Sequence, residues 1–100
     1  MICVFVTFRF GDDFSAAKLQ TIAENARSMF AGLPGLRSKL FSIEPQLREA
    51  RNVYLWNDPE AARAFFTPEM RNRITALYGV APIIEYGEVA AFVDNQAQSS

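Results

Sequence analysis

The chain has 100 residues, of which 50% are hydrophobic and 21% are charged, and its formal net charge at pH 7 is −1. This length and apolar content fit one domain with its own hydrophobic core and leave no room for a second domain. Acidic and basic residues are mixed along the chain, so the basic patch typical of nucleic-acid and membrane-surface proteins is missing. We therefore expect neither a nucleic acid nor a membrane as a partner.

The sequence contains one cysteine, Cys3, and no histidine. A single cysteine cannot form a disulfide within the chain, which fits a reducing compartment, and we expect a cytoplasmic protein. Without histidine, catalytic triads that use imidazole and zinc sites with histidine ligands are excluded. Asp12 and Asp13 stand together in a turn without further ligands, so we expect no metal site.

The N-terminal third of the chain predicts a strand followed by a helix. Residues 2–10 are rich in Val and Phe and form the first predicted strand. Over residues 14–30, apolar side chains recur at helical spacing with polar residues between them, which predicts an amphipathic helix. Asp13 or Ser15 can cap its start, and Gly32 can adopt the left-handed conformation after its end.

The middle of the chain predicts an antiparallel hairpin. The breaker sequence GLPG, residues 32–35, precedes a second strand over residues 36–45. A polar connection over residues 46–51 leads to a third strand over residues 52–57. The short connection favours antiparallel pairing of these two strands.

Two helix starts and one strand follow. Asp58 and Pro59 form a strong helix start, and Thr67 with the following proline repeats that signal, so we expect two helical pieces with a bend near Thr67. Gly79 ends the second piece. Residues 81–93 then predict a long fourth strand.

The predicted order of elements is strand, helix, strand, strand, helix, strand. This order indicates an α+β, ferredoxin-like βαββαβ fold, in which the helices cover one face of a four-stranded antiparallel sheet. We expect residues 1–94 to form this domain. Residues 95–100 are small and polar, and we expect them to form a flexible tail.

Apolar residues occupy both faces of the predicted strands. Phe5 alternates with Val4 and Val6, and Tyr54 alternates with Val53. The helices cover only one face, and soluble monomers rarely expose an apolar patch of more than roughly a few hundred Å². We therefore expect a homodimer in which two sheets pair face to face as a dimeric α/β barrel.

The parity of the strands predicts which side chains line the shared interior. We expect Val53, Leu55, Leu36 and Leu40 to pack beneath the helices, because they match the apolar helix stripes. The opposite parity then mixes aromatic and polar side chains, as ligand pockets do. Its members are Phe5, Thr7, Arg9, Arg37, Lys39, Phe41, Tyr54, Trp56, Tyr86 and Glu88.

The segments PGLRSKLFS and NVYLWNDPEAARAFF resemble the YdhR-like mono-oxygenase family. This family belongs to the dimeric α/β-barrel superfamily and is related to the antibiotic-biosynthesis mono-oxygenases, and the likeness extends from the first strand to the fourth. The resemblance implies an enzyme without a cofactor, in which an electron-rich phenolic or anthrone substrate itself reduces dioxygen inside the barrel pocket. The related enzymes surround the substrate with tryptophan, asparagine, arginine and tyrosine, and Trp56, Asn57 and the arginines match these residue types.

Four residues are the candidates for catalysis: Lys39, Trp56, Asn57 and Glu88. Lys39 or Glu88 would deprotonate the substrate, because a desolvated lysine has a lowered pKa. Trp56, Asn57 or an arginine would stabilise the negative charge that develops. Each residue also has a structural interpretation: dimer packing for Trp56, a snorkelling side chain for Lys39, turn chemistry for Asn57, and an ion pair with Lys39 for Glu88.

The remaining candidates would contact the substrate, and they are Phe5, Thr7, Arg9, Arg37, Phe41, Tyr54 and Tyr86. The leading hypothesis is a homodimeric, cofactor-independent mono-oxygenase that acts on a small aromatic or conjugated organic molecule. The alternatives are a non-catalytic dimeric module that binds a small hydrophobic ligand, a structural protein whose own side chains fill the barrel, and a cofactor-free isomerase or decarboxylase that uses the same base.

Overall fold

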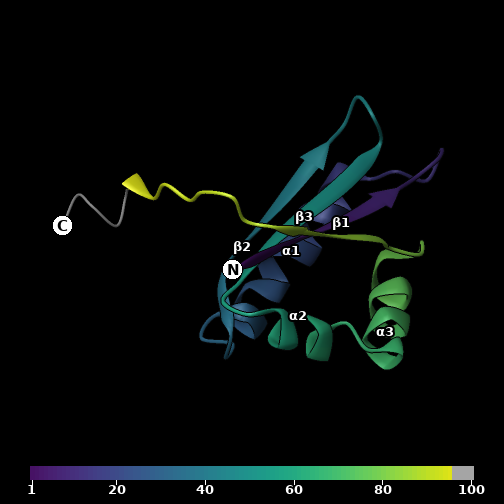
Figure 1. Cartoon of the computed structure of the whole chain (residues 1–100). Helices are drawn as coiled ribbons and strands as arrows, with labels where there is room; N and C mark the ends of the chain where they lie inside the picture. The colour runs from purple at the N-terminus through teal and green to yellow at the C-terminus, as the bar shows by residue number, and fades with distance from the viewer. Residues whose placement is uncertain (96–100) are drawn as a thin grey trace.

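The structure is a computed structural model that describes residues 1–95 of the chain. Its elements are β1 (Ile2–Arg9), α1 (Ala16–Phe30), β2 (Leu36–Glu44), β3 (Glu49–Trp56), α2 (Pro59–Phe65), α3 (Pro68–Tyr78) and β4 (Ile83–Glu88). The strands form one antiparallel sheet in the order β2-β3-β1-β4, and all three helices lie on one face of it (Figure 1). The predicted α+β, ferredoxin-like fold is confirmed.

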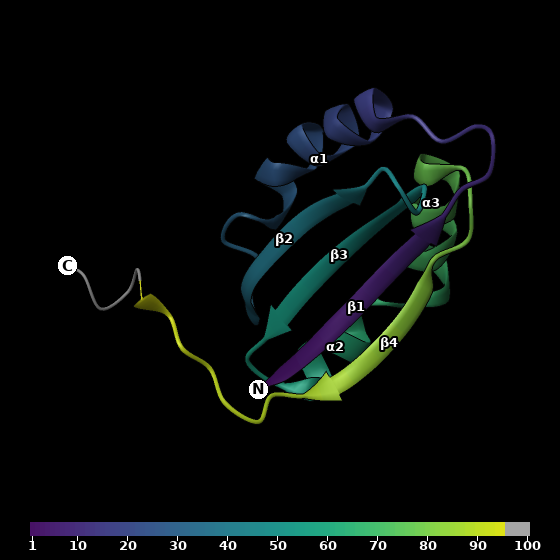
Figure 2. The ribbon, with the colours of Figure 1, turned by 90° about the horizontal axis from the view of Figure 1, so that it is seen from above.

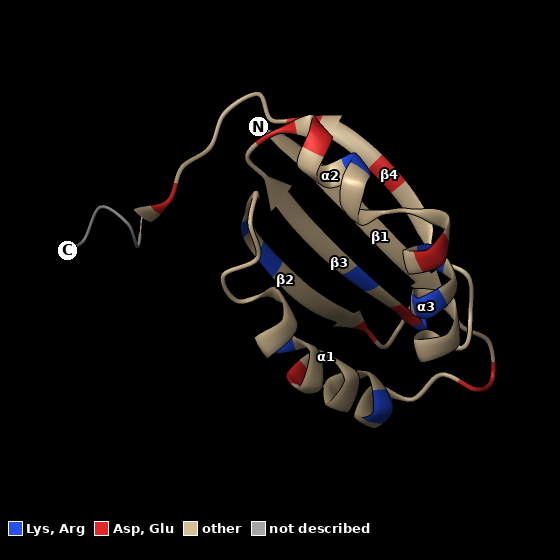
Figure 3. Ribbon diagram, turned by 90° about the horizontal axis from the view of Figure 1, so that it is seen from below, with Lys and Arg blue, Asp and Glu red and all other residues tan. Residues whose placement is uncertain are grey.

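The helices frame the covered face of the sheet from two sides. Seen from above, α1 runs along the β2 side, whereas α2 and α3 lie towards β1 and β4 (Figure 2). The view from below shows the same division, with β3 between the two groups of helices (Figure 3). None of α1, α2 and α3 lies on the opposite face of the sheet.

Side-chain caps set the helix boundaries. Ser15 is the cap of α1, because its hydroxyl accepts a hydrogen bond from the backbone N–H of Lys18 at 3.1 Å. Gly32 follows the helix with a φ of 75°, in the left-handed region that glycine adopts without strain. Of the two predicted caps, Ser15 rather than Asp13 therefore starts this helix.

The bend predicted near Thr67 is confirmed as a break between α2 and α3. Asp58 caps α2 by accepting from the N–H of Ala61 at 2.8 Å, and Thr67 caps α3 by accepting from the N–H of Met70 at 3.1 Å. Both helices carry proline in their first turn, where the missing N–H costs no hydrogen bond. Gly79 ends α3 with a φ of 84°, as expected.

Two strand boundaries differ from the prediction by three residues or more. β3 begins at Glu49 rather than at residue 52, and β4 ends at Glu88 rather than at residue 93. β4 is an edge strand whose neighbour is β1, and Glu88 is paired with Ile2, the first residue of that neighbour. Beyond this pair only the carbonyl of Met1 remains, and it accepts from the N–H of Val89 at 3.1 Å. The strand ends because its partner ends.

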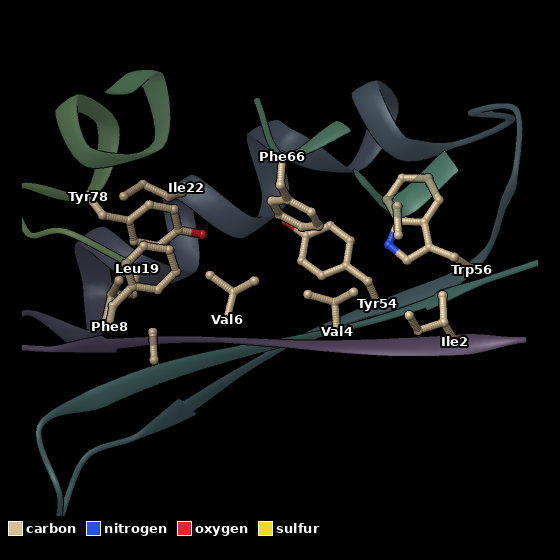
Figure 4. Close-up of a cluster of buried hydrophobic side chains, with 12 residues drawn as sticks. Ile2, Val4, Val6, Phe8, Leu19, Ile22, Tyr54, Trp56, Phe66 and Tyr78 are labelled. Atoms are coloured by element: carbon tan, nitrogen blue, oxygen red, sulfur yellow. The ribbon is translucent and has the colours of Figure 1, made fainter. Parts of the chain in front are cut away.

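The hydrophobic core lies between the sheet and the helices. Alternate residues of β1 point towards the helices and meet aromatic rings from β3, α2 and α3 (Figure 4). The buried side chains labelled there are Ile2, Val4, Val6, Phe8, Leu19, Ile22, Tyr54, Trp56, Phe66 and Tyr78.

Within residues 1–95, no helix is long and apolar enough to cross a membrane. The tail predicted over residues 95–100 lies, except for Asn95, outside the described residues.

Candidate active site

The strand register decides which side chains face the helices. Tyr54 on β3 pairs with Val4 on β1 and with Lys39 on β2. Val4 is fully buried beneath the helices, and side chains at paired positions point to the same face of a sheet. Tyr54 and Lys39 therefore face the helices, and Val53 faces the opposite, uncovered side.

The predicted division of the strand residues between the two faces was largely wrong. Leu36 packs against the core as expected, but Val53, Leu55 and Leu40 lie on the uncovered face. The predicted lining set is split between the faces. Phe5, Thr7 and Arg9 lie on the uncovered face, Arg37 lies in a β-bulge, and the helix side carries Lys39, Phe41, Tyr54, Trp56, Tyr86 and Glu88.

Large aromatic rings, rather than branched aliphatic side chains, fill the layer beneath the helices. Tyr54 and Trp56 stack in parallel with ring centroids 6.1 Å apart, and Phe65 at the end of α2 and the following Phe66 pack against them at tilted and edge-on angles. Such offset and edge-to-face contacts stabilise an aromatic cluster beyond the burial of its area. The cluster explains why this parity of β3 is the buried one.

Trp56 is a core residue of the protomer rather than a residue of a dimer interface. Its side chain is 1% exposed, and it lines none of the hollows described below. Among the described residues, its Nε1 has no hydrogen-bond partner. The structure therefore does not bring Trp56 to the surface of a binding site.

A cavity of about 280 Å³ opens between the sheet and the helices. Its floor comes from the strands and its walls from α1 on one side and α2 and α3 on the other, the helices that flank β3 in Figure 3. The lining residues are Phe8, Ala26, Met29, Phe30, Lys39, Phe41, Asn52, Tyr54, Phe65, Arg73, Ile74, Leu77 and Tyr78. The walls are mostly apolar and aromatic with a few polar groups, which is typical of small-molecule sites.

A second hollow adjoins the cavity. It is a groove of about 540 Å³ between α1 and the edge strand β2, and Lys39 lines both the groove and the cavity. The amine thus stands at the boundary between an open surface groove and an apolar interior.

Aromatic rings surround the amine of Lys39. Its Nζ lies 3.3 Å from the ring centroid of Phe30, 4.2 Å from that of Phe41 and 4.3 Å from that of Tyr54. Removal from water lowers the pKa of Lys39 from 10.5 to about 6, because burial disfavours the ammonium form. The ring faces act in the opposite direction because they attract a cation. Within residues 1–95 no carboxylate pairs with this lysine, so the neutral amine is available near pH 7.

Glu88 is not the ion-pair partner of Lys39. It is exposed at the end of β4, and Lys39 lies on β2, the opposite edge of the sheet. Three strand spacings separate the two edges, which corresponds to about 14 Å. The prediction of a Lys39–Glu88 pair was wrong.

The second polar group of the cavity is a pair formed by Asn52 and Tyr78. The side-chain amide of Asn52 donates to the Tyr78 hydroxyl at 3.1 Å, and the Tyr78 ring stacks on Phe8 with centroids 3.7 Å apart. Burial raises the pKa of Tyr78, and the hydrogen bond from Asn52 opposes this shift. The phenol therefore remains protonated, and because its oxygen accepts from Asn52, its proton is free to be donated to a ligand.

Tyr54 supplies a second phenol to the cavity. Burial raises the pKa of this hydroxyl, and charge on Tyr78 would raise it further. It too remains protonated at neutral pH. The cavity therefore combines the amine of Lys39 with two phenols, the amide of Asn52 and the guanidinium of Arg73.

Sequence reasoning missed the roles of Asn52 and Tyr78. Tyr78 fitted the apolar stripe of its helix, and Asn52 stood at the presumed start of a strand. The available signal was the parity of Asn52 with Tyr54 on one strand: a buried amide requires a hydrogen-bond partner from a facing element.

Most of the predicted site residues lie outside the cavity, whose lining includes only Lys39, Phe41 and Tyr54 of the predicted set. Asn57 is exposed in the turn after β3, where its backbone N–H donates to the carbonyl of Gly35 at 2.8 Å. Arg9 pairs with Glu49 at 3.0 Å on the uncovered face. Arg37 pairs with Asp94 at 3.7 Å. Tyr86, although on the helix side, is 43% exposed and lines a different, shallow hollow.

Comparison with solved structures shows that monooxygenases are among the proteins that share this fold. No family model matches the sequence, and no curated protein sequence matches it. A monooxygenase from Streptomyces coelicolor, in complex with nanaomycin D, has a TM-score of 0.68 at 17% identity and covers 92% of this chain and 89% of its own. SnoaB, a cofactor-independent oxygenase from Streptomyces nogalater, has a TM-score of 0.63 at 18% identity, with coverages of 92% and 96%.

A third solved structure bears on assembly. A dimeric ferredoxin-like protein of unknown function from Thermobifida fusca has a TM-score of 0.67 at 14% identity and covers 88% of this chain and 90% of its own. At these identities the likeness concerns the fold. The chain has a ferredoxin-like fold, which it shares with these monooxygenase structures.

Proposed function

We propose that this protein is a mono-oxygenase that oxidises a small aromatic or conjugated molecule in the cavity between sheet and helices, without a bound cofactor. One observation carries the proposal: a single aromatic-walled cavity brings together the neutral amine of Lys39 and the Tyr78 hydroxyl held by Asn52. The fold that the chain shares with a cofactor-independent oxygenase supports it.

The first step is removal of a proton from the substrate by Lys39. A base whose pKa lies near the working pH is the most effective, and burial brings this lysine into that range. The ammonium that forms faces the rings of Phe30, Phe41 and Tyr54, which attract a cation. The Tyr78 hydroxyl donates to the substrate oxygen on which the negative charge develops.

The second step uses the electrons of the substrate itself. The substrate anion passes one electron to dioxygen, the resulting radical pair combines to form a carbon–oxygen bond, and loss of water leaves a carbonyl group. Overall, a CH₂ group and O₂ become a C=O group and water, so no external reductant is consumed. The role of the protein is to generate the anion and hold it in an apolar cavity.

Loss of the Tyr78 hydroxyl or of its partner tests this function. With anthrone as substrate, we expect Tyr78→Phe and Asn52→Ala each to lower kcat about 100-fold, the usual effect of removing one oxyanion donor or its support. Oxygen uptake measured with an electrode gives the rate. Thr75→Ser is the control, because Thr75 lies on the same helix and bonds to the carbonyl of Arg71 outside the cavity.

Three outcomes of the uptake experiment are distinguishable. Loss of uptake in both variants but not in the control supports the proposal. Uptake that is unchanged in both variants removes the Asn52–Tyr78 pair from the mechanism. If wild-type protein binds anthrone, as judged by a rise in Tm, but consumes no oxygen with any of a panel of anthrones and quinols, the chain is a binding module instead.

We further propose that the uncovered face of the sheet pairs with a second copy of the chain. Its exposed apolar residues include Phe5 at 37%, Leu40 at 54% and Ile83 at 39% exposure. Register places Leu40, Val53 and Phe5 side by side across three strands, so they form a continuous patch. A fold neighbour that is described as dimeric supports the pairing.

A charge placed in this patch is expected to separate the copies. Leu40→Glu should weaken self-association about 100-fold or more, because a buried unpaired carboxylate is costly in an apolar interface. Leu47→Glu is the matched control, since Leu47 is 63% exposed in the turn after β2. Sedimentation equilibrium measures the dissociation constant; a wild-type chain that stays monomeric at micromolar concentration would remove the dimer from the account.

A further inference from the structure

We propose that Lys39 captures aromatic aldehydes as a covalent imine in the cavity between the sheet and the helices. The inference goes beyond the proposed function: it uses the same cavity but needs neither dioxygen nor the Asn52–Tyr78 pair. The reactive group would be the side-chain amine rather than the substrate carbon.

The position of the amine favours this chemistry. Lys39 lines both the groove along α1 and β2 and the mostly apolar cavity, so a carbonyl compound in either space can reach the amine. Among the described residues no carboxylate pairs with it. An ammonium held in an ion pair cannot attack a carbonyl carbon, whereas a free amine can.

The walls of the cavity select the class of carbonyl compound. Phe30, Phe41 and Tyr54 present ring faces within 4.3 Å of Nζ, so a flat aromatic ring attached to the carbonyl group can stack where the ammonium would otherwise lie. Small aliphatic aldehydes lack that contact. Aryl aldehydes therefore fit best.

The reaction balances without an oxidant or reductant. The nitrogen lone pair attacks the carbonyl carbon, and a C–N bond forms as one N–H proton moves to the oxygen. The hydroxyl then leaves as water with the second N–H proton, and a C=N double bond remains. One amine and one aldehyde thus give one imine and one water.

The chain offers an internal control because it contains two lysines, Lys18 and Lys39. Lys18 is exposed on α1, outside the cavity. An amine that is neutral at pH 7 forms imines much faster than a protonated one, and burial lowers the pKa of Lys39 to about 6. Selective modification of one lysine over the other therefore reports on the cavity.

The experiment is reductive trapping under anaerobic conditions. Native protein is incubated with 2-naphthaldehyde and cyanoborohydride at pH 7, digested, and analysed by mass spectrometry for N-naphthylmethyl groups on Lys39, Lys18 and the N-terminal amine. We expect labelling of Lys39 to exceed that of Lys18 at least about 10-fold. A pKa lowered by only one unit already raises the fraction of neutral amine about tenfold, and the pKa of Lys39 is lowered by more than that. We also expect naphthalene to slow the labelling of Lys39 alone.

Two controls keep the result unambiguous. In urea the two lysines should label equally, and with acetaldehyde the selectivity should fall because the ring contact is lost. Native protein in which Lys39 labels no faster than Lys18 overturns the inference. Because the labelling is carried out without oxygen, it tests imine formation independently of the oxygenase function. Labelling without oxygen uptake would support the imine alone, and oxygen uptake without labelling would support the oxygenase function alone.

Discussion

Replacement of Trp56 by alanine is expected to lower the free energy of unfolding by about 3–5 kcal/mol, the range observed when a buried tryptophan is truncated. Trp56 is among the largest fully buried side chains, and it lies where β3 passes beneath α2. Its removal would take away the ring that stacks on Tyr54 and packs against Phe65. Because Gly35 and Ala61 already approach each other closely near this ring, the backbone has little freedom to close the void.

Urea unfolding monitored by circular dichroism measures this loss. Trp56→Phe should cost less than the alanine variant, because a ring remains in the cluster and the Nε1 that lacks a partner is removed. Phe92→Ala is the control for an aromatic side chain in a loop; Phe92 is 44% exposed, and the change should stay within about 0.5 kcal/mol. A cost below about 1 kcal/mol for Trp56→Ala would show that the aromatic cluster is not the core of the fold.

Replacement of Lys39 by methionine is expected to stabilise the protein and to change how its stability depends on pH. In the folded state the pKa of Lys39 is about 6, whereas in the unfolded chain it returns to about 10.5. Between these values the unfolded chain binds one more proton, so wild-type stability should rise as the pH increases from about 6 to about 10.5. Below pH 6 both states are protonated and the full cost of the buried ammonium is present.

The Lys39→Met variant removes this cost without leaving a void. We expect it to raise the free energy of unfolding by several kcal/mol near pH 6, because each unit of a pKa shift corresponds to about 1.4 kcal/mol, with the gain shrinking as the pH approaches 10. Lys18→Met should show no such trend, since that side chain is exposed. Urea unfolding at a series of pH values provides the measurement. A gain that is equal at all pH values, or absent, would mean that the amine remains charged in the folded protein.

The order of elements and the helix boundaries could be predicted because local signals determine them. Asp58 with Pro59, Thr67 with Pro68, and Gly79 each act through backbone groups a few residues away. Such signals are contained in the sequence itself. The alternation of β1 was equally clear, since Thr7 and Arg9 share one parity and Val4 and Val6 share the other.

Residues 52–57 alone do not show which face of β3 is buried beneath the helices. Val53 and Leu55 are as apolar as the aromatic residues between them, so parity within residues 52–57 was ambiguous. The structure extends β3 back to Glu49, and Glu49 and Arg51 share the parity of Val53. These two charged residues indicate that this parity faces outward, and the error in the strand boundary therefore caused the error in the site.

The site itself depends on contacts between distant segments. Asn52 meets Tyr78 across 26 residues of sequence, and Lys39 meets Phe30 across the turn between α1 and β2. Local sequence patterns do not predict such contacts between distant residues. The amine of Lys39 is removed from water, as expected, but it lies on the helix side of the sheet rather than on the expected face.

A structure of the protein with bound anthrone would test the location of the site most directly. The ligand should lie between the sheet and the helices, with its ring against Phe41 and Tyr54 and its oxygen within hydrogen-bonding distance of the Tyr78 hydroxyl. Density for the ligand on the uncovered face of the sheet, in contact with Phe5 and Leu40, would contradict the assignment of the cavity as the active site.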